Sequence, residues 1–298
     1  MPSQEHERFI RDRLETIPRE GDLEAARQDF EQLLARFPAP SDTSIASFTI
    51  GDMRADWVRV ANTKPGRTFL YFHGGAYMLG SNVAYRNFAG RLAHACSARV
   101  LLVDYRLAPE QPFPAAVEDG FNAYRWMVES GMDPREIVIG GDSAGGGLTL
   151  ATLVSSRDEG LALPRGAVLY SPWTDLECAG NSHQPGVVDD PFFTAEGVRA
   201  LGMAYAGDQV RNPLASPLHA DLSGLPALLI FAGTREILLD DATRLASRAR
   251  ESGVGVQLEI GEGLMHAWPV YDLPESRECL MATGTFLDGV FENTLEQQ

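Results

Sequence analysis

The 298-residue chain predicts a doubly wound α/β fold with a mostly parallel central sheet flanked by helices. Short apolar runs alternate with amphipathic helical patterns along most of the sequence, as such folds require. The apolar runs between residues 68 and 232 are almost continuous, which is typical of strands that helices cover on both faces. A single long stretch, 177–222, interrupts the alternation with glycine, proline, asparagine and aspartate.

The predicted strands are short, with apolar and β-branched residues, and cover 56–61, 68–73, 99–104, 136–140, 166–170, 226–232 and 255–260. The predicted helices carry apolar residues at three-and-four spacing and cover 83–96, 114–130, 144–157, 239–252 and 276–292. The segment 255–260 alternates apolar and polar residues, as an edge strand does. Because open edges invite pairing, a homodimer through this strand is a hypothesis.

Two further helical patterns open the chain. The first has an apolar stripe of Phe9, Ile10, Leu14 and Ile17, and the second one of Leu23, Ala26, Phe30, Leu33, Leu34 and Phe37. Pro18 and Gly21 separate the two. Neither helix would be stable alone, and the segment 177–222, with a helical stretch near 194–206, is too long for an ordinary connection. We expect one domain over 1–298, with a cap from about 1–45 and about 180–215 above the carboxyl edge of the sheet.

Composition excludes several classes of protein. A formal charge of −16 argues against nucleic-acid partners, which such a chain repels. The three cysteines (Cys96, Cys178 and Cys279) are far apart, with neither a disulfide framework nor a zinc-site spacing. The charged first twenty residues lack the apolar core of a signal peptide, and no apolar run approaches membrane-spanning length. The expectation is a cytoplasmic protein without stable membrane insertion.

Ser143 stands in the sequence Gly141-Asp142-Ser143-Ala144-Gly145, between a predicted strand and a predicted helix. A strand-to-helix turn this sharp requires small residues two before and two after the serine, and both are glycine. The turn exposes the hydroxyl above the sheet, and the helix N-terminus directs its positive end to the same place. A plain glycine-rich turn or a phosphate-binding loop is the alternative. In this context the pattern favours Ser143 as a nucleophile.

The sequence His73-Gly74-Gly75-Ala76 directly follows the strand 68–73. Two glycines leave room for backbone N–H groups to approach a substrate oxygen. We predict that the N–H groups of Gly74, Gly75 and Ala144 form an oxyanion hole with three donors. An ordinary glycine turn after a strand is the alternative.

A serine nucleophile needs a base, and His266 is the best placed of the six histidines. It follows the last strand by a loop, and loops at the carboxyl ends of parallel strands meet above the sheet. The others are placed less well: His6 in the charged N-terminus, His73 beside the glycines, His94 within a helix, and His183 and His219 in the irregular insertion.

The third member of such a triad should be an acid after the penultimate strand, because the chain order on this type of sheet is serine, acid, histidine. Glu236, Asp240 and Asp241 are the alternatives. Asp240 and Asp241 begin a helix, where capping and dipole effects explain them. Glu236 lies in the loop itself and is therefore favoured.

Taken together, these residues closely resemble the bacterial hormone-sensitive-lipase-like esterases of the α/β-hydrolase superfamily. The resemblance runs from about Phe69 to Trp268 and rests on HGGA at 73–76, DYRLAPE at 104–110 with FPA at 113–115, GDSAGGG at 141–147, SPW at 171–173 and the His266 loop. It implies an α/β-hydrolase fold with a partly N-terminal helical cap and a Ser-acid-His carboxylesterase that acts on short-chain acyl esters without a metal or organic cofactor. The chain departs from the family pattern at Ala76, usually a third glycine, and at Arg235-Glu236, near a common aspartate.

Two other functions remain open. One is a catalytically silent small-molecule-binding protein, because the family includes a plant hormone receptor that lacks the catalytic histidine. The other is an amidase or lactonase, which uses the same tetrahedral chemistry. Apolar residues near the motifs are predicted to line a substrate pocket or to belong to the core: Tyr77, Met78, Trp173, Phe192, Phe193, Leu264 and Trp268.

Overall fold

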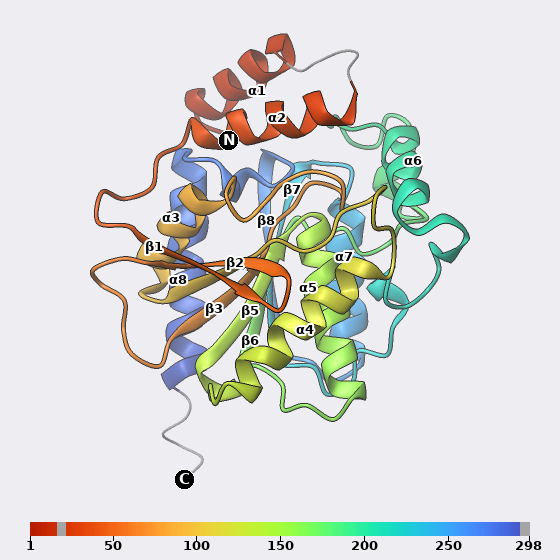
Figure 1. Ribbon diagram of the computed structural model, residues 1–298. Coiled ribbons are helices and arrows are strands. Elements are labelled where there is room, and N and C mark those ends of the chain that lie inside the picture. Colours follow the sequence, from red (N-terminus) through yellow and green to blue (C-terminus); the bar gives the residue numbers. More distant parts are fainter. Residues whose placement is uncertain (17–21, 293–298) are drawn as a thin grey trace.

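A computed structural model describes residues 1–16 and 22–292. Within them, eight strands form one sheet in the order β1-β2-β4-β3-β5-β6-β7-β8 (Figure 1). β2 is antiparallel to both β1 and β4, and the six strands from β4 to β8 in that order run parallel. The predicted mostly parallel sheet is confirmed.

The strands are β1 (Ser44–Ile50), β2 (Met53–Arg59), β3 (Thr68–Phe72), β4 (Arg99–Val103), β5 (Ile137–Asp142), β6 (Gly166–Tyr170), β7 (Ala227–Arg235) and β8 (Val256–Met265). The α-helices are α1 (Gln4–Thr16), α2 (Leu23–Ala35), α3 (Arg86–Cys96), α4 (Ala115–Glu129), α5 (Ala144–Asp158), α6 (Ala195–Ala206), α7 (Leu239–Glu251) and α8 (Pro274–Glu292). Short 3-10 helices are η1 (Pro134–Glu136), η2 (Asn181–His183), η3 (Gly207–Gln209), η4 (Pro217–His219) and η5 (Trp268–Val270).

The sheet separates two apolar cores. Leu70 and Ile139 face the core that contains α4, α5 and α7, whereas their neighbours Phe69 and Val138 face the core that contains α3 and α8. Successive side chains of a strand point to opposite faces, so a strand covered on both sides must be apolar at every position. This explains the continuous apolar runs of the sequence.

Helices α1 and α2 lie together across one end of the molecule, with α6 near the same end (Figure 1). Phe9, Ile10, Leu33 and Leu34 are buried in the core that contains α3 and α8, and Phe30 and Phe37 pack against it, which confirms six of the ten predicted stripe residues. Leu14 is 46% exposed, so the prediction that it belongs to the buried apolar stripe of the first helix is wrong. The predictions for Ile17, Pro18 and Gly21 lie outside the described residues.

The differences from the predicted elements lie at the margins of the sheet. The strand β1 was not predicted, because its side chains are mostly exposed and leave no apolar run. β2 begins three residues earlier than expected. β8 continues beyond residue 260 through two glycines to Met265 and ends the sheet, as expected of an edge strand. None of the helices in the described ranges combines the length and hydropathy needed to cross a bilayer.

Candidate active site

Ser143 occupies the sharp turn between β5 and α5 with φ 53° and ψ −120°, in the left-handed half of backbone space. The two flanking glycines are sterically required. A Cβ on Gly145 would lie 2.1 Å from the carbonyl oxygen of Phe72, and one on Gly141 would lie 2.4 Å from the backbone of Gly145. Non-glycine residues in this region are strained and persist only where the surroundings fix them. The predicted sharp turn between strand and helix at Ser143 is confirmed.

Asp142, next to the serine, is buried and holds the glycine loop. Its carboxylate accepts hydrogen bonds from Tyr71 Oη at 2.8 Å, Tyr85 Oη at 2.9 Å and the N–H of Gly74 at 2.9 Å. Burial raises the pKa of Asp142 to about 6, against the opposing effect of the two tyrosine hydroxyls. The carboxylate ties the end of β5 to the loop that follows β3.

The same bond removes Gly74 from the predicted oxyanion hole. Its N–H donates to Asp142 Oδ1 and to Tyr85 Oη, and a Cβ there would meet the Asp142 carboxylate at 2.2 Å. Gly75 and Ala76 instead line the cavity that holds Ser143. The prediction for Gly74 is wrong because its N–H faces inward to a buried carboxylate. Ala76, with φ 56°, was not among the predicted donors.

Ala144 is the first residue of α5 and follows Ser143 directly. N–H groups in the first turn of a helix have no acceptor within the helix, so they are free for a ligand. Its N–H group therefore lies at the positive end of α5, beside the serine.

Glu236 and His266 are in direct contact. The Nδ1 of His266 lies 2.6 Å from Glu236 Oε2, while Glu236 Oε1 accepts from the N–H of Gly233 at 2.6 Å and from Ser171 Oγ at 3.0 Å. Ser171 also accepts the N–H of Ala267 at 3.0 Å, so one hydroxyl joins the two loops. Both oxygens of the Glu236 carboxylate are thus fixed by hydrogen bonds. The His266 imidazole is held through Nδ1, so its Nε2 is available to exchange a proton with a reacting group.

The charge of His266 is set by opposing effects. Burial lowers the pKa of the imidazole, but the hydrogen bond and the charge of Glu236 raise it, and the net pKa lies above the ordinary 6.5. Asp190 and Asp142 raise the pKa further. The site stabilises an imidazolium, as a group that takes a proton from a nucleophile requires.

The two alternative acids have other partners: both accept backbone N–H groups, and Asp241 also lies 3.4 Å from Nε2 of the buried His183. Asp241 is buried and accepts the N–H groups of Thr174 at 2.7 Å and Asp175 at 2.8 Å. Asp240 accepts the N–H of Ser182 at 3.0 Å. Together they attach the segment 174–183 to the first turn of α7, and within the described residues neither carboxylate is hydrogen-bonded or ion-paired with His266. The geometry therefore favours Glu236 over either aspartate.

A cavity of about 390 Å³ is lined by both Ser143 and His266. Four of the seven predicted pocket residues are in its lining: Met78, Trp173, Phe192 and Phe193. The ring of Phe193 stands edge-on to His266 with 5.2 Å between ring centroids. The other cavity walls come from α1 and α2 (Arg13, Leu23, Ala26, Asp29, Phe30, Leu33), from α6 (Val198, Leu201) and from loops (Leu79, Tyr85, Ile237, Leu238, Ala267, Val270, Tyr271).

The other three predicted pocket residues belong to the core. Tyr77 is 1% exposed and stacks on Tyr205, with 3.8 Å between ring centroids. Leu264 and Trp268 pack in the core that contains α3 and α8. For these three the pocket prediction is wrong and the core alternative holds, because closeness to a motif in sequence does not determine on which side of the backbone a side chain lies.

Asp190, in the insertion, was missed by sequence reasoning. Its carboxylate accepts the N–H groups of Phe192 at 2.8 Å and Phe193 at 3.0 Å with one oxygen, and that of Ile237 at 2.8 Å with the other. It thereby joins the insertion to the Glu236 loop and holds Phe193 against His266. The run Asp189-Asp190-Pro191 was the available signal, because aspartate before proline often begins a turn.

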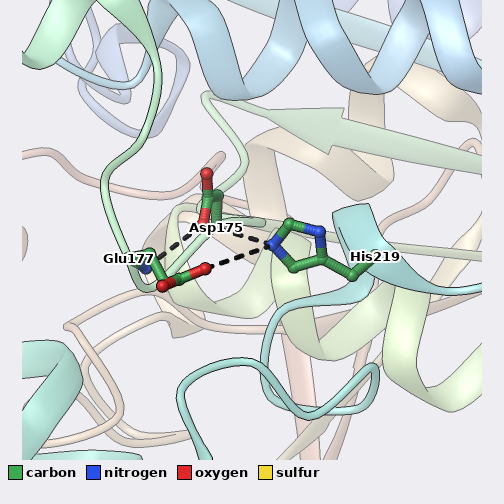
Figure 2. Close-up of side chains that lie close together, drawn as sticks. All are labelled: Asp175, Glu177 and His219. Carbon is green, nitrogen blue, oxygen red and sulfur yellow. Dashed lines mark hydrogen bonds and ion pairs between the residues drawn. The ribbon is translucent and has the colours of Figure 1, made fainter.

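Asp175, Glu177 and His219 converge beside the insertion (Figure 2). His219 Nε2 lies 3.5 Å from Asp175 and 4.0 Å from Glu177. Each carboxylate already has an arginine partner, Arg244 at 2.6 Å and Arg211 at 2.5 Å. These arginines balance the charge that would attract a cation, and the cluster serves to fasten the insertion.

Comparison with known proteins agrees with this geometry. The family described as alpha/beta hydrolase fold matches residues 69–270. An acetyl-hydrolase of Streptomyces hygroscopicus is 45% identical over 242 residues, 80% of this chain and 81% of that protein. An esterase of Acinetobacter venetianus is 31% identical over 88% of each chain. The crystal structure of an esterase from the bacterial hormone-sensitive lipase family superposes with a TM-score of 0.94 at 39% identity, covering 98% of this chain and 99% of that one.

The fold and the match over residues 69–270 place the chain in the α/β-hydrolase family. Within that family it belongs with the esterases of the bacterial hormone-sensitive lipase family, and it is a carboxylic ester hydrolase.

Proposed function

We propose that the protein is a serine carboxylesterase that hydrolyses short-chain acyl esters through Ser143, Glu236 and His266. The 2.6 Å contact between His266 Nδ1 and Glu236 Oε2, in the cavity that also contains Ser143, carries this proposal. Ser143 Oγ attacks the ester carbonyl while His266 Nε2 takes its proton, and Glu236 stabilises the imidazolium. His266 then protonates the departing alcohol. Water, deprotonated by His266, releases the acid and restores Ser143.

The tetrahedral intermediate carries a negative oxygen that needs preorganised donors. We assign this role to the N–H groups of Gly75, Ala76 and Ala144. Gly75 and Ala76 line the cavity, and the N–H of Ala144 is free at the start of α5. Asp142 supports the arrangement because it holds the N–H of Gly74, which turns the following residues toward the cavity.

The cavity supports a small acyl ester as substrate. Its volume of about 390 Å³ is at the lower end for small-molecule sites, and its lining is mostly apolar. One relative is named an acetyl-hydrolase. Acyl chains of about two to six carbons are expected to fit, and specificity constants for chromogenic esters should fall for longer chains. A constant that keeps rising to sixteen carbons would indicate a lipase instead.

Replacement of the nucleophile tests the mechanism. Ser143→Ala should fold normally and lose about 10⁴-fold or more of its turnover of a chromogenic acetyl ester. A folded variant that keeps near-normal turnover would overturn the mechanism. Wild-type protein that binds esters without turnover would favour the silent binding protein, and preferential hydrolysis of matched amides or lactones would favour an amidase or lactonase.

Two features of organisation belong to the same proposal. Residues 1–298 form one domain whose cap comes from about 1–45 and about 180–215. The cavity lining contributed by α1, α2 and α6 supports this cap.

A homodimer forms through β8, since this strand ends the sheet and leaves one edge unpaired. Light scattering that gives a mass near 32.5 kDa at micromolar concentration would count against the dimer.

A further inference from the structure

His6 is fully buried, although it lies in the first turn of a charged helix. Its Nε2 lies 3.3 Å from the backbone nitrogen of Met265, whose N–H donates to it. Met265 is the last residue of β8 and directly precedes His266. The first turn of α1 is therefore joined to the peptide that leads into the base.

The position of Met265 explains why this bond matters. β8 ends the sheet, so no further strand supplies acceptors on its outer side. Met265 is fully buried, and a buried N–H without an acceptor is costly. Pairing with β7 is also irregular here, because the register shifts between Gly233 and Arg235. The imidazole of His6 supplies the acceptor.

Only the neutral imidazole, with its proton on Nδ1, can accept through Nε2. Burial lowers the pKa of His6, which favours this form at neutral pH. Glu275 and Glu7 oppose that shift, and Arg235 adds to it. The Nδ1 atom, which carries the proton in this form, is buried without a hydrogen-bond partner among the described residues, and Glu7 Oε1 lies 3.7 Å away.

The helix also reaches the loop that carries the acid. Glu7 pairs with Arg235 at 3.1 Å, and Arg235 directly precedes Glu236. The N-terminus of α1 is anchored separately, since the N–H of Ser3 donates to Glu275 at the start of α8 at 2.5 Å. His6 thus lies between two other contacts of α1. The Ser3–Glu275 hydrogen bond does not involve the loops of Glu236 or His266, whereas the Glu7–Arg235 ion pair reaches the residue before Glu236.

We propose that His6 is a positioning residue for ester hydrolysis, because it holds the Met265 peptide and so fixes where His266 stands between Ser143 and Glu236. This inference rests on the proposed function, in which His266 is the general base. Displacement of a reacting group by about 1 Å can reduce a rate about 100-fold, so an acceptor one residue from the base has a catalytic effect.

Two substitutions of His6 separate the acceptor from packing. The side-chain amide of glutamine reaches about as far as Nε2, whereas that of asparagine reaches only as far as Nδ1. His6→Gln should keep kcat within about threefold of wild type. His6→Asn should lower kcat about 10- to 100-fold with KM within about twofold. Equal kcat for His6→Asn and wild type, or an equal loss in both variants, would overturn the proposal.

Glu275→Ala is the matched control. It removes the acceptor of the Ser3 N–H and loosens α1, while the loss of its charge favours the neutral His6 imidazole that accepts the Met265 N–H. Its Tm should fall while kcat stays at the wild-type value. A loss of kcat in this control equal to that in His6→Asn would show that loosening α1 is sufficient, which would contradict a specific role for His6.

A measurement on the wild-type protein covers the case in which a His6 variant does not fold. In ¹⁵N-labelled protein at pH 7, a scalar coupling across the hydrogen bond should connect the Met265 amide nitrogen and His6 Nε2. Absence of the coupling would refute the bond. The coupling does not depend on turnover, so it persists in Ser143→Ala and distinguishes failure of this inference from failure of the proposed mechanism.

Discussion

Glu236 and Asp241 are two fully buried carboxylates, five residues apart, and each lies beside a histidine, but only one of those histidines lines the cavity. Glu236 lies in the loop after β7 and contacts a titratable side chain, His266, at the cavity. Asp241 lies in the first turn of α7, accepts two backbone N–H groups of the segment 174–175, and lies 3.4 Å from Nε2 of the buried His183, which is not in the cavity lining. Burial raises the pKa of both carboxyls, and hydrogen bonds oppose the rise in each.

The comparison teaches that burial and a shifted pKa do not identify a catalytic acid. A histidine partner does not identify it either, because Asp241 has one in His183. What distinguishes Glu236 is that its histidine, His266, lines the cavity that contains Ser143. Glu236 should therefore affect the rate, and Asp241 should affect the free energy of unfolding.

The largest expected effect is that of Glu236→Gln. The amide keeps the shape of the side chain but can donate to Nδ1, which favours the wrong tautomer of His266. The loss of kcat should approach about 10⁴-fold, the value for the equivalent change in a serine protease. Steady-state kinetics with a chromogenic ester measures it, and circular dichroism checks the fold. Turnover near the wild-type value would remove Glu236 from the triad.

The second prediction concerns pH. The neutral form of His266 is the active base, and its pKa is raised above 6.5, so kcat/KM should rise with pH through a limb above 6.5. Below the limb, the value should fall about tenfold per pH unit. Asp241→Asn should leave the limb in place, since Asp241 does not contact His266. A shift of this limb in Asp241→Asn would contradict the claim that Asp241 has no part in the protonation of His266.

Asp241→Asn itself should reduce stability. Both backbone N–H groups donate to one oxygen, Oδ2, so the amide oxygen can still accept them, but without the charge these bonds are weaker and the free energy of unfolding should fall by about 1–3 kcal/mol. Because the loss is structural, kcat should stay within about threefold. Urea unfolding measures the free energy, and steady-state kinetics on the same preparation measures kcat. A collapse of kcat in a stably folded variant would reverse the assignment.

The smallest effect belongs to Asp240→Asn, the matched control for its neighbour. Asp240 accepts one N–H, that of Ser182, and stands in the first turn of α7. Loss of its charge should cost about 0.3–1 kcal/mol through the helix dipole. Thermal unfolding should show a shift smaller than that of Asp241→Asn, and an equal or larger shift would contradict the ranking.

Several parts of the fold could be predicted because local physics fixes them. The continuous apolar strands are predictable because both faces of the sheet are covered, and the sharp turn at Ser143 because Gly141 and Gly145 leave no room for a Cβ. β1 could not be predicted, since an exposed strand carries no apolar pattern.

The sequence by itself determined which residues are available to the site: a serine in a strained turn, a histidine and an acid after the last two strands, and a glycine loop. Tertiary structure alone decided their partners. It turned the Gly74 N–H inward to Asp142, placed Tyr77 in the core, and brought His6 to the peptide before His266. A periodic pattern records which face of an element is buried, whereas a hydrogen bond between residues 259 positions apart depends on how distant elements pack.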